Sequence, residues 1–158
     1  MLKRHYQFAL AVTLAGLGAT NASAQQGAAK CSIVYNADEA LGEIIKYEHF
    51  DFDGYDRLCR LLEARGLALR IGADYGVLAE RAYGFVSIAF MRRATGVRGS
   101  SYRTSMVISR TATTPDARSA MYEAMNDALA QMAELPDDYV ASVATEEARL
   151  RRALAARP

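Results

Sequence analysis

Histidine and carboxylate side chains that could act together in catalysis or metal binding are few in this sequence. After residue 24 the only histidine is His49, and Asp51 and Asp53 follow it at alternating positions. This spacing fits an EF-hand calcium loop only in part, because the first position is not a carboxylate and the twelfth, which should be a bidentate glutamate, is Arg60. We therefore predict a polar strand face leading to a helix cap at Asp53, and no metal site. The alternative is that His49 and Asp51 together bind a metal ion, or act as a base and its orienting partner.

Nucleophilic side chains are equally sparse. Ser100 and Ser101 lie between two strand-like runs and not at the strand-to-helix turn of a G-x-S-x-G motif. The run G-V-R-G-S-S lacks the lysine and the following helix of a phosphate-binding loop. The sequence thus predicts no cofactor and favours a non-catalytic protein over a small hydrolase that uses His49.

Cys31 and Cys59 are the only cysteines. In an oxidising compartment an even pair predicts one intramolecular disulfide. Their spacing excludes a C-x-x-C redox pair.

Arginine outnumbers lysine fifteen to two after residue 24, and six arginines but no acid occur between Arg81 and Pro115. Guanidinium groups bind carboxylates and phosphates in a bidentate manner. The candidate partner-binding residues are therefore Arg92, Arg93, Arg98 and Arg103. A G+C-rich genome would explain the arginine excess without any function. Seven acids between residues 31 and 56 either neutralise the basic segment or leave one of the two regions facing a charged partner.

These arginines lie on a predicted β-hairpin from Tyr83 to Arg110. In the first arm both faces are largely apolar, which predicts a central strand covered on both sides. The second arm alternates Tyr102, Thr104, Met106 and Ile108 with more polar residues, which predicts one solvent-facing side. Gly96 and Gly99 are expected to supply positive φ values in the connecting loop.

The remaining elements follow from periodicity and capping residues. Short strands are predicted at 32–35, 67–71 and 76–82, with a turn at 72–74. Helices are predicted after Asn36, after Asp53, after Thr114 and from Asp137, the third with a buried methionine stripe and the last with Leu150 and Leu154 inward. The last helix is either continuous or interrupted at Thr145.

The first 24 residues have the layout of a secretory signal peptide. Lys3 and Arg4 precede an apolar run, and Ala22-Ser23-Ala24 provides the small residues of a cleavage site. We expect cleavage after Ala24, export to the periplasm and no transmembrane segment in the mature chain. Loss of Lys3 and Arg4 changes the formal charge from +1 to −1, so charge alone implies no partner class.

The predicted fold is a single α+β domain over residues 25–158, with an antiparallel sheet of three or four strands centred on the hairpin at 83–110, about four helices and one disulfide. The predicted function is non-catalytic binding of another periplasmic or envelope protein, as an inhibitor or immunity partner of a toxin or cell-wall enzyme, or as an envelope accessory factor. The alternative is binding of an anionic small molecule or envelope glycan by the arginine-rich hairpin. Nucleic acid is not an expected partner, and the sequence sets no oligomeric state.

Overall fold

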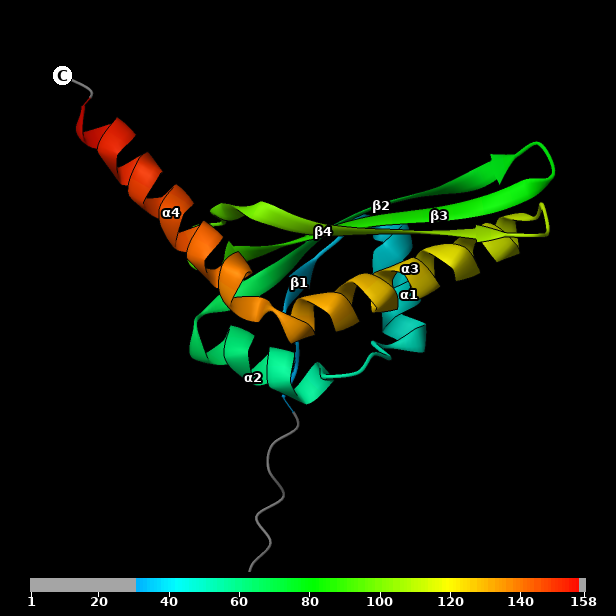
Figure 1. Ribbon diagram of the computed structural model, residues 1–158, viewed down its shortest axis with the longest axis horizontal. Helices are drawn as coiled ribbons and strands as arrows, with labels where there is room; N and C mark the ends of the chain where they lie inside the picture. Colours follow the sequence, from blue (N-terminus) through cyan, green and yellow to red (C-terminus); the bar gives the residue numbers. More distant parts are fainter. Residues whose placement is uncertain (1–30, 157–158) are drawn as a thin grey trace, which may run out of the picture.

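The fold is a four-stranded sheet with helices on one face (Figure 1). It is seen in a computed structural model that describes residues 31–156. The elements in chain order are β1 (Tyr35–Asn36), α1 (Glu39–Glu48), α2 (Tyr55–Ala64), β2 (Leu67–Leu78), β3 (Arg81–Arg92), β4 (Arg98–Ser109), α3 (Thr114–Glu134) and α4 (Pro136–Ala155). The predicted α+β class, the four helices and the hairpin are confirmed. The predicted signal peptide lies outside the described residues.

The sheet has the order β1-β2-β3-β4. Strands β2, β3 and β4 form the predicted antiparallel ladder, whereas the two residues of β1 pair with β2 in parallel. The sheet is therefore mixed. A parallel pair needs a crossover connection, and here α1 and α2 provide it.

Strand β2 is one continuous strand, so the predicted turn at 72–74 is wrong. Gly72 and Gly76 both lie within the ladder, and the chain reverses at Ala79 and Glu80. The ring of Tyr83 lies beside Gly76, where an added Cβ would be 3.1 Å from its Cε1 atom. Gly76 thus makes room for a neighbouring aromatic ring within the strand, and neither glycine marks a turn.

Two other glycines let helices approach the sheet closely. A Cβ on Gly84 would lie 2.0 Å from the backbone nitrogen of Met121 in α3, and one on Gly99 would lie 2.2 Å from Oγ of Ser142 in α4. Of the two loop glycines predicted to have positive φ, only Gly96 has it, at 69°. Gly99 instead serves the packing of α4 on β4.

The core lies between the sheet and the helices. It contains the predicted methionine stripe of α3 together with the helix-facing side chains of β2 and β3, and its largest members are Phe90, Leu69, Ile71, Ile88, Met121, Met125, Leu129 and Met132. Burial of such side chains is the main favourable term in folding.

The predicted disulfide between Cys31 and Cys59 is confirmed, with Cα atoms 6.0 Å apart. It ties the chain before β1 to the buried side of α2. The caps of the first helices differ from prediction. Asp38 caps α1 through the amide of Leu41. The N-cap residue of α2 is Gly54, which provides no side-chain cap, so Asp53 is not the cap.

Helix α4 is continuous through Thr145, whose hydroxyl donates to the carbonyl of Ala141. Its second half extends beyond the sheet (Figure 1). Leu150 and Leu154 are consequently 46% and 63% exposed, and their predicted inward orientation is wrong.

Candidate binding surface on the open face of the sheet

The sheet face opposite the helices carries large apolar side chains that no element of residues 31–156 covers. We call it the open face. Phe85 on β3 is 37% exposed, and Tyr102, Met106 and Ile108 on β4 are 63%, 59% and 52% exposed. The predicted covering of the first hairpin arm on both sides is therefore wrong.

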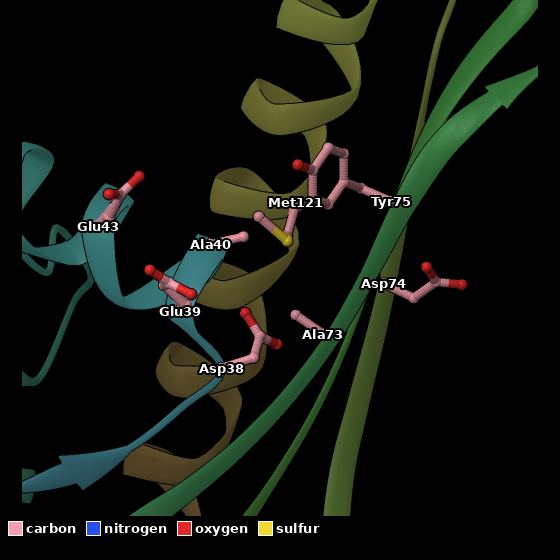
Figure 2. Close-up of a pocket in the computed structure, with 8 residues that line it drawn as sticks. All are labelled: Asp38, Glu39, Ala40, Glu43, Ala73, Asp74, Tyr75 and Met121. Carbon is pink, nitrogen blue, oxygen red and sulfur yellow. The ribbon is translucent and has the colours of Figure 1, made fainter.

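Strand alternation explains which side chains reach the open face. Gly84 and Gly99 must face the helices, because only glycine allows those close approaches. Residues one position away then point outward. On β2, Figure 2 shows Ala73 and Tyr75 on the side of α1 and Met121, while Asp74 points away from them.

Cross-strand pairing aligns the open-face residues in rows. Phe85 pairs with Met106, Tyr83 with Ile108, and Ala89 with Tyr102. Directly opposed residues of antiparallel strands share one face, so the Tyr83/Ile108 and Phe85/Met106 pairs form two adjacent apolar rows along β3 and β4. The polar pair of Ser87 and Thr104 separates them from Ala89 and Tyr102. Exposed apolar surfaces of this kind mark interaction sites.

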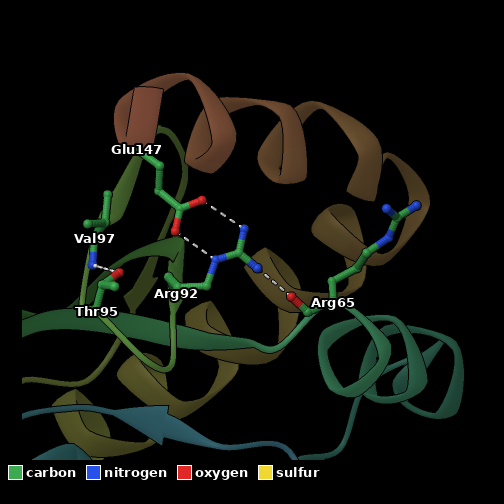
Figure 3. Close-up of polar contacts among 5 residues, drawn as sticks. All are labelled: Arg65, Arg92, Thr95, Val97 and Glu147. Atoms are coloured by element: carbon green, nitrogen blue, oxygen red, sulfur yellow. Dashed lines mark hydrogen bonds and ion pairs between the residues drawn. The ribbon is translucent and has the colours of Figure 1, made fainter. Parts of the chain in front are cut away.

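The predicted arginines are not gathered at one surface. Arg92 spans from β3 to α4, where its Nε and Nη2 atoms donate to the two carboxylate oxygens of Glu147 over 2.9 and 3.0 Å (Figure 3). Its Nη1 atom donates to the carbonyl oxygen of Arg65 at the end of α2. Arg92 thus joins three elements of the fold.

This ion pair alters the ionisation of both partners. The hydrogen bonds from Arg92 lower the pKa of Glu147, and those to Glu147 raise the pKa of Arg92. Neither salt bridge of the described residues uses an acid between residues 31 and 56. Among the described residues, Arg92 therefore receives its counter-charge from α4, and the other hairpin arginines make no ion pair.

Arg93 and Arg103 also face the body of the protein. The Nε atom of Arg93 donates to the carbonyl oxygen of Leu67 over 2.6 Å. The backbone N–H of Arg93 donates to the carbonyl oxygen of Gly66 over 3.0 Å. Arg103 pairs with the buried Ile88 and so lies on the helix side of β4. Its buried Nε atom has no hydrogen-bond partner within residues 31–156.

Arg98 is the predicted arginine that reaches the open face. It lines a depression of about 350 Å³ whose other lining residues are Arg70, Gly72, Ser87, Ala89 and Tyr102. Sequence analysis missed Arg70, Tyr102 and the apolar rows as parts of one surface. The sequence carries no signal that separates the two faces, because Gly84 and Gly99 face the helices whereas Gly72 and Gly76 lie on the open face.

The acidic segment forms a separate hollow beside α1. Asp38, Glu39 and Glu43 line a space of about 490 Å³ between α1 and β2 (Figure 2). Asp74, which also lines it, directs its carboxylate to the opposite side and accepts a hydrogen bond from the hydroxyl of Tyr83 over 3.2 Å. No group of three metal-binding side chains occurs among the described residues.

His49 is the residue that follows the last turn of α1. It is exposed, has a φ of 61°, and donates its backbone N–H to the carbonyl of Ile45. The amide of Asp51 donates to the side chain of Asn126 over 3.1 Å. No hydrogen bond or ion pair joins His49 to Asp51 in this part of the chain.

None of the helices in residues 31–156 is both long enough and apolar enough to span a membrane.

Comparison with known proteins assigns no family. No family model matches the chain, and no curated protein matches it. Among solved structures, a Caulobacter crescentus CB15 protein provisionally described as a lipoprotein is 17% identical, with 60% of this chain and 86% of that one covered and a TM-score of 0.25. A similarity at that score supports no inference about fold or function.

Proposed function

We propose that this chain is a non-catalytic periplasmic protein that binds another envelope or periplasmic protein through the open face of its sheet. The role is that of an envelope accessory factor, or of an inhibitor or immunity partner of a toxin or cell-wall enzyme. The main support for this proposal is the uncovered apolar surface of β3 and β4, where Tyr102, Met106 and Ile108 are each more than half exposed.

The composition of this surface supports a protein partner. Aromatic residues, methionine and arginine are enriched in protein interfaces, whereas lysine and glutamate are depleted. The open face carries Tyr83, Phe85, Tyr102, Met106, Arg70 and Arg98. A rigid sheet also presents these side chains with little ordering cost on binding.

The expected partner has an apolar surface that includes at least one carboxylate. Arg70 and Arg98 give this end of the open face a positive charge, and the single acid Asp74 is bonded to Tyr83. Charge complementarity of this kind speeds association and excludes wrong partners.

A second candidate function is binding of an anionic small molecule or envelope glycan. The depression between Arg70 and Arg98 favours it, because Tyr102 offers an aromatic wall beside two guanidinium groups. Binding of a small anion does not explain why Phe85, Met106 and Ile108 are exposed on the same face.

Binding by surface variants tests the proposal. Met106→Glu should weaken binding of the partner by roughly tenfold or more, since removal of a central interface side chain costs about 1–2 kcal/mol or more. Tyr47→Glu is the matched control, because Tyr47 is 74% exposed on α1, away from the open face. Both variants should retain the wild-type melting temperature. Equal binding by Met106→Glu and wild type would contradict the proposal.

A further inference from the structure

We propose that the depression between Arg70 and Arg98 is a subsite for one carboxylate side chain of the protein partner. This inference rests on the proposed function, because it assigns chemistry to one end of the open face. It assigns Arg70, Arg98, Tyr102 and Ser87 to the contact with this carboxylate.

The sheet register places these residues together. Arg70 on β2, Ala89 on β3 and Tyr102 on β4 form one row across the sheet, and Gly72 and Ser87 form part of the next. Neighbouring strands lie about 4.8 Å apart, so β2 and β4 are separated by roughly 10 Å across β3. Long side chains on the two outer strands therefore flank the middle strand.

Small residues make this part of the sheet hollow. Gly72, Ser87 and Ala89 form the floor, while Arg70, Arg98 and Tyr102 form the sides. A carboxylate seated above the floor would receive guanidinium donors from both sides. The Ser87 hydroxyl can donate a further hydrogen bond from below.

Arg70 and Arg98 differ from Arg92 and Arg93 in having no internal acceptor. Within residues 31–156 neither makes a side-chain hydrogen bond or an ion pair, whereas Arg92 binds Glu147 and Arg93 binds the Leu67 carbonyl. Both are exposed. Two unpaired guanidinium groups that line one hollow attract an anion that can bind them in a bidentate manner.

The surroundings favour a carboxylate on a polypeptide over one on a sugar. The next rows of the open face contain Phe85 with Met106 and Tyr83 with Ile108. An acidic side chain flanked by apolar residues would fill the depression while its neighbours cover these rows. A free sugar acid or phosphate would leave them exposed to water.

Titration with model anions, followed by backbone amide NMR, tests the subsite without the natural partner. The probes are a hexaglutamate peptide, a hexaglutamine peptide of the same length, an oligogalacturonate and inorganic phosphate. Hexaglutamate should shift the amide signals of Gly72, Ser87, Ala89 and Tyr102 more strongly than the other three probes. Added salt should weaken the effect, since exposed charges are screened.

Arginine variants give the decisive comparison. Arg70→Gln and Arg98→Gln should each weaken hexaglutamate binding by roughly tenfold, the loss expected for a hydrogen bond between charged groups. Arg81→Gln, an exposed arginine at the far end of β3, should leave it unchanged. Unchanged binding by both depression variants, an equal response to hexaglutamine, or a response confined to oligogalacturonate or phosphate would overturn the inference. If one of those outcomes is seen and Met106→Glu still loses partner binding, the proposed function stands and only the subsite is rejected.

Discussion

The backbone of Met121 lies directly against Gly84. A Cβ placed on Gly84 would approach the Met121 nitrogen to 2.0 Å and its Cα to 2.3 Å. This contact fixes α3 on one face of β3 and, through strand alternation, sends Phe85 to the other. The same close approach therefore builds the core and exposes the candidate binding surface.

Gly84→Ala should strongly destabilise the protein, because the helix backbone must move to admit the methyl group. We expect the free energy of unfolding to fall by about 3 kcal/mol or more. Chemical denaturation measures this change in the free energy of unfolding. Gly42→Ala is the matched control, since nothing lies within 4 Å of a Cβ there and Gly42 lies within α1. That variant should gain roughly 0.5–1 kcal/mol. Equal stability of the two variants would contradict the packing described.

The Arg92–Glu147 ion pair predicts a pH-dependent contribution to stability. Arg92 lowers the pKa of Glu147 in the folded state, so the folded state favours the charged carboxylate more than the unfolded state does. The contribution is present above the unfolded pKa of about 4.3 and is lost as the pH falls through the lower folded pKa. Glu147→Gln should lower the melting temperature by a few degrees at pH 7 and by less at pH 3.

Glu146→Gln provides the control for this measurement. Glu146 pairs with Arg149 within the same helix at 3.6 Å, and Arg149 is largely exposed. At pH 7, loss of the Glu146–Arg149 ion pair should change the melting temperature less than loss of the Arg92–Glu147 pair does. A difference between Glu147→Gln and wild type that stays constant from pH 7 to pH 3 would show that the ion pair does not cause it.

The α+β class and the hairpin could be predicted from the sequence because both depend on local patterns. The disulfide could be predicted because Cys31 and Cys59 are the only two cysteines. The methionine stripe of α3 and the start of this helix near Pro115 could also be predicted from local sequence patterns. The continuous β2 was missed because Gly72, Ala73 and Asp74 signal a turn locally, whereas pairing with β3 keeps all three in the ladder.

The candidate surface depends on which face the helices cover, and local pattern does not decide that. Tyr102, Met106 and Ile108 look like core residues by type, yet they face outward because Gly99 must face α4. The partner of Arg92 was missed for a related reason. Glu147 lies 55 positions away, and only the packing of α4 beside the hairpin brings the two together.

The disulfide predicts a specific loss of stability on reduction. Cys31 and Cys59 are 28 positions apart, and a closed loop of that size contributes about 3–4 kcal/mol. Free-thiol labelling of denatured, unreduced protein should find essentially none. The double variant Cys31→Ala with Cys59→Ala should melt as low as the reduced wild type and should not respond to reductant. Stoichiometric labelling of the unreduced protein would exclude the bond.

Site-specific photocrosslinking in intact cells tests the central claim most directly. A photoreactive amino acid at Tyr102 or Met106 should form a discrete crosslinked product with another protein, and the product should disappear when Ile108→Glu is added. The same group at Tyr47, which is also exposed but lies on α1, should form no such product. If Tyr47 gives the product and the two β4 positions do not, the open face of the sheet is not the binding surface.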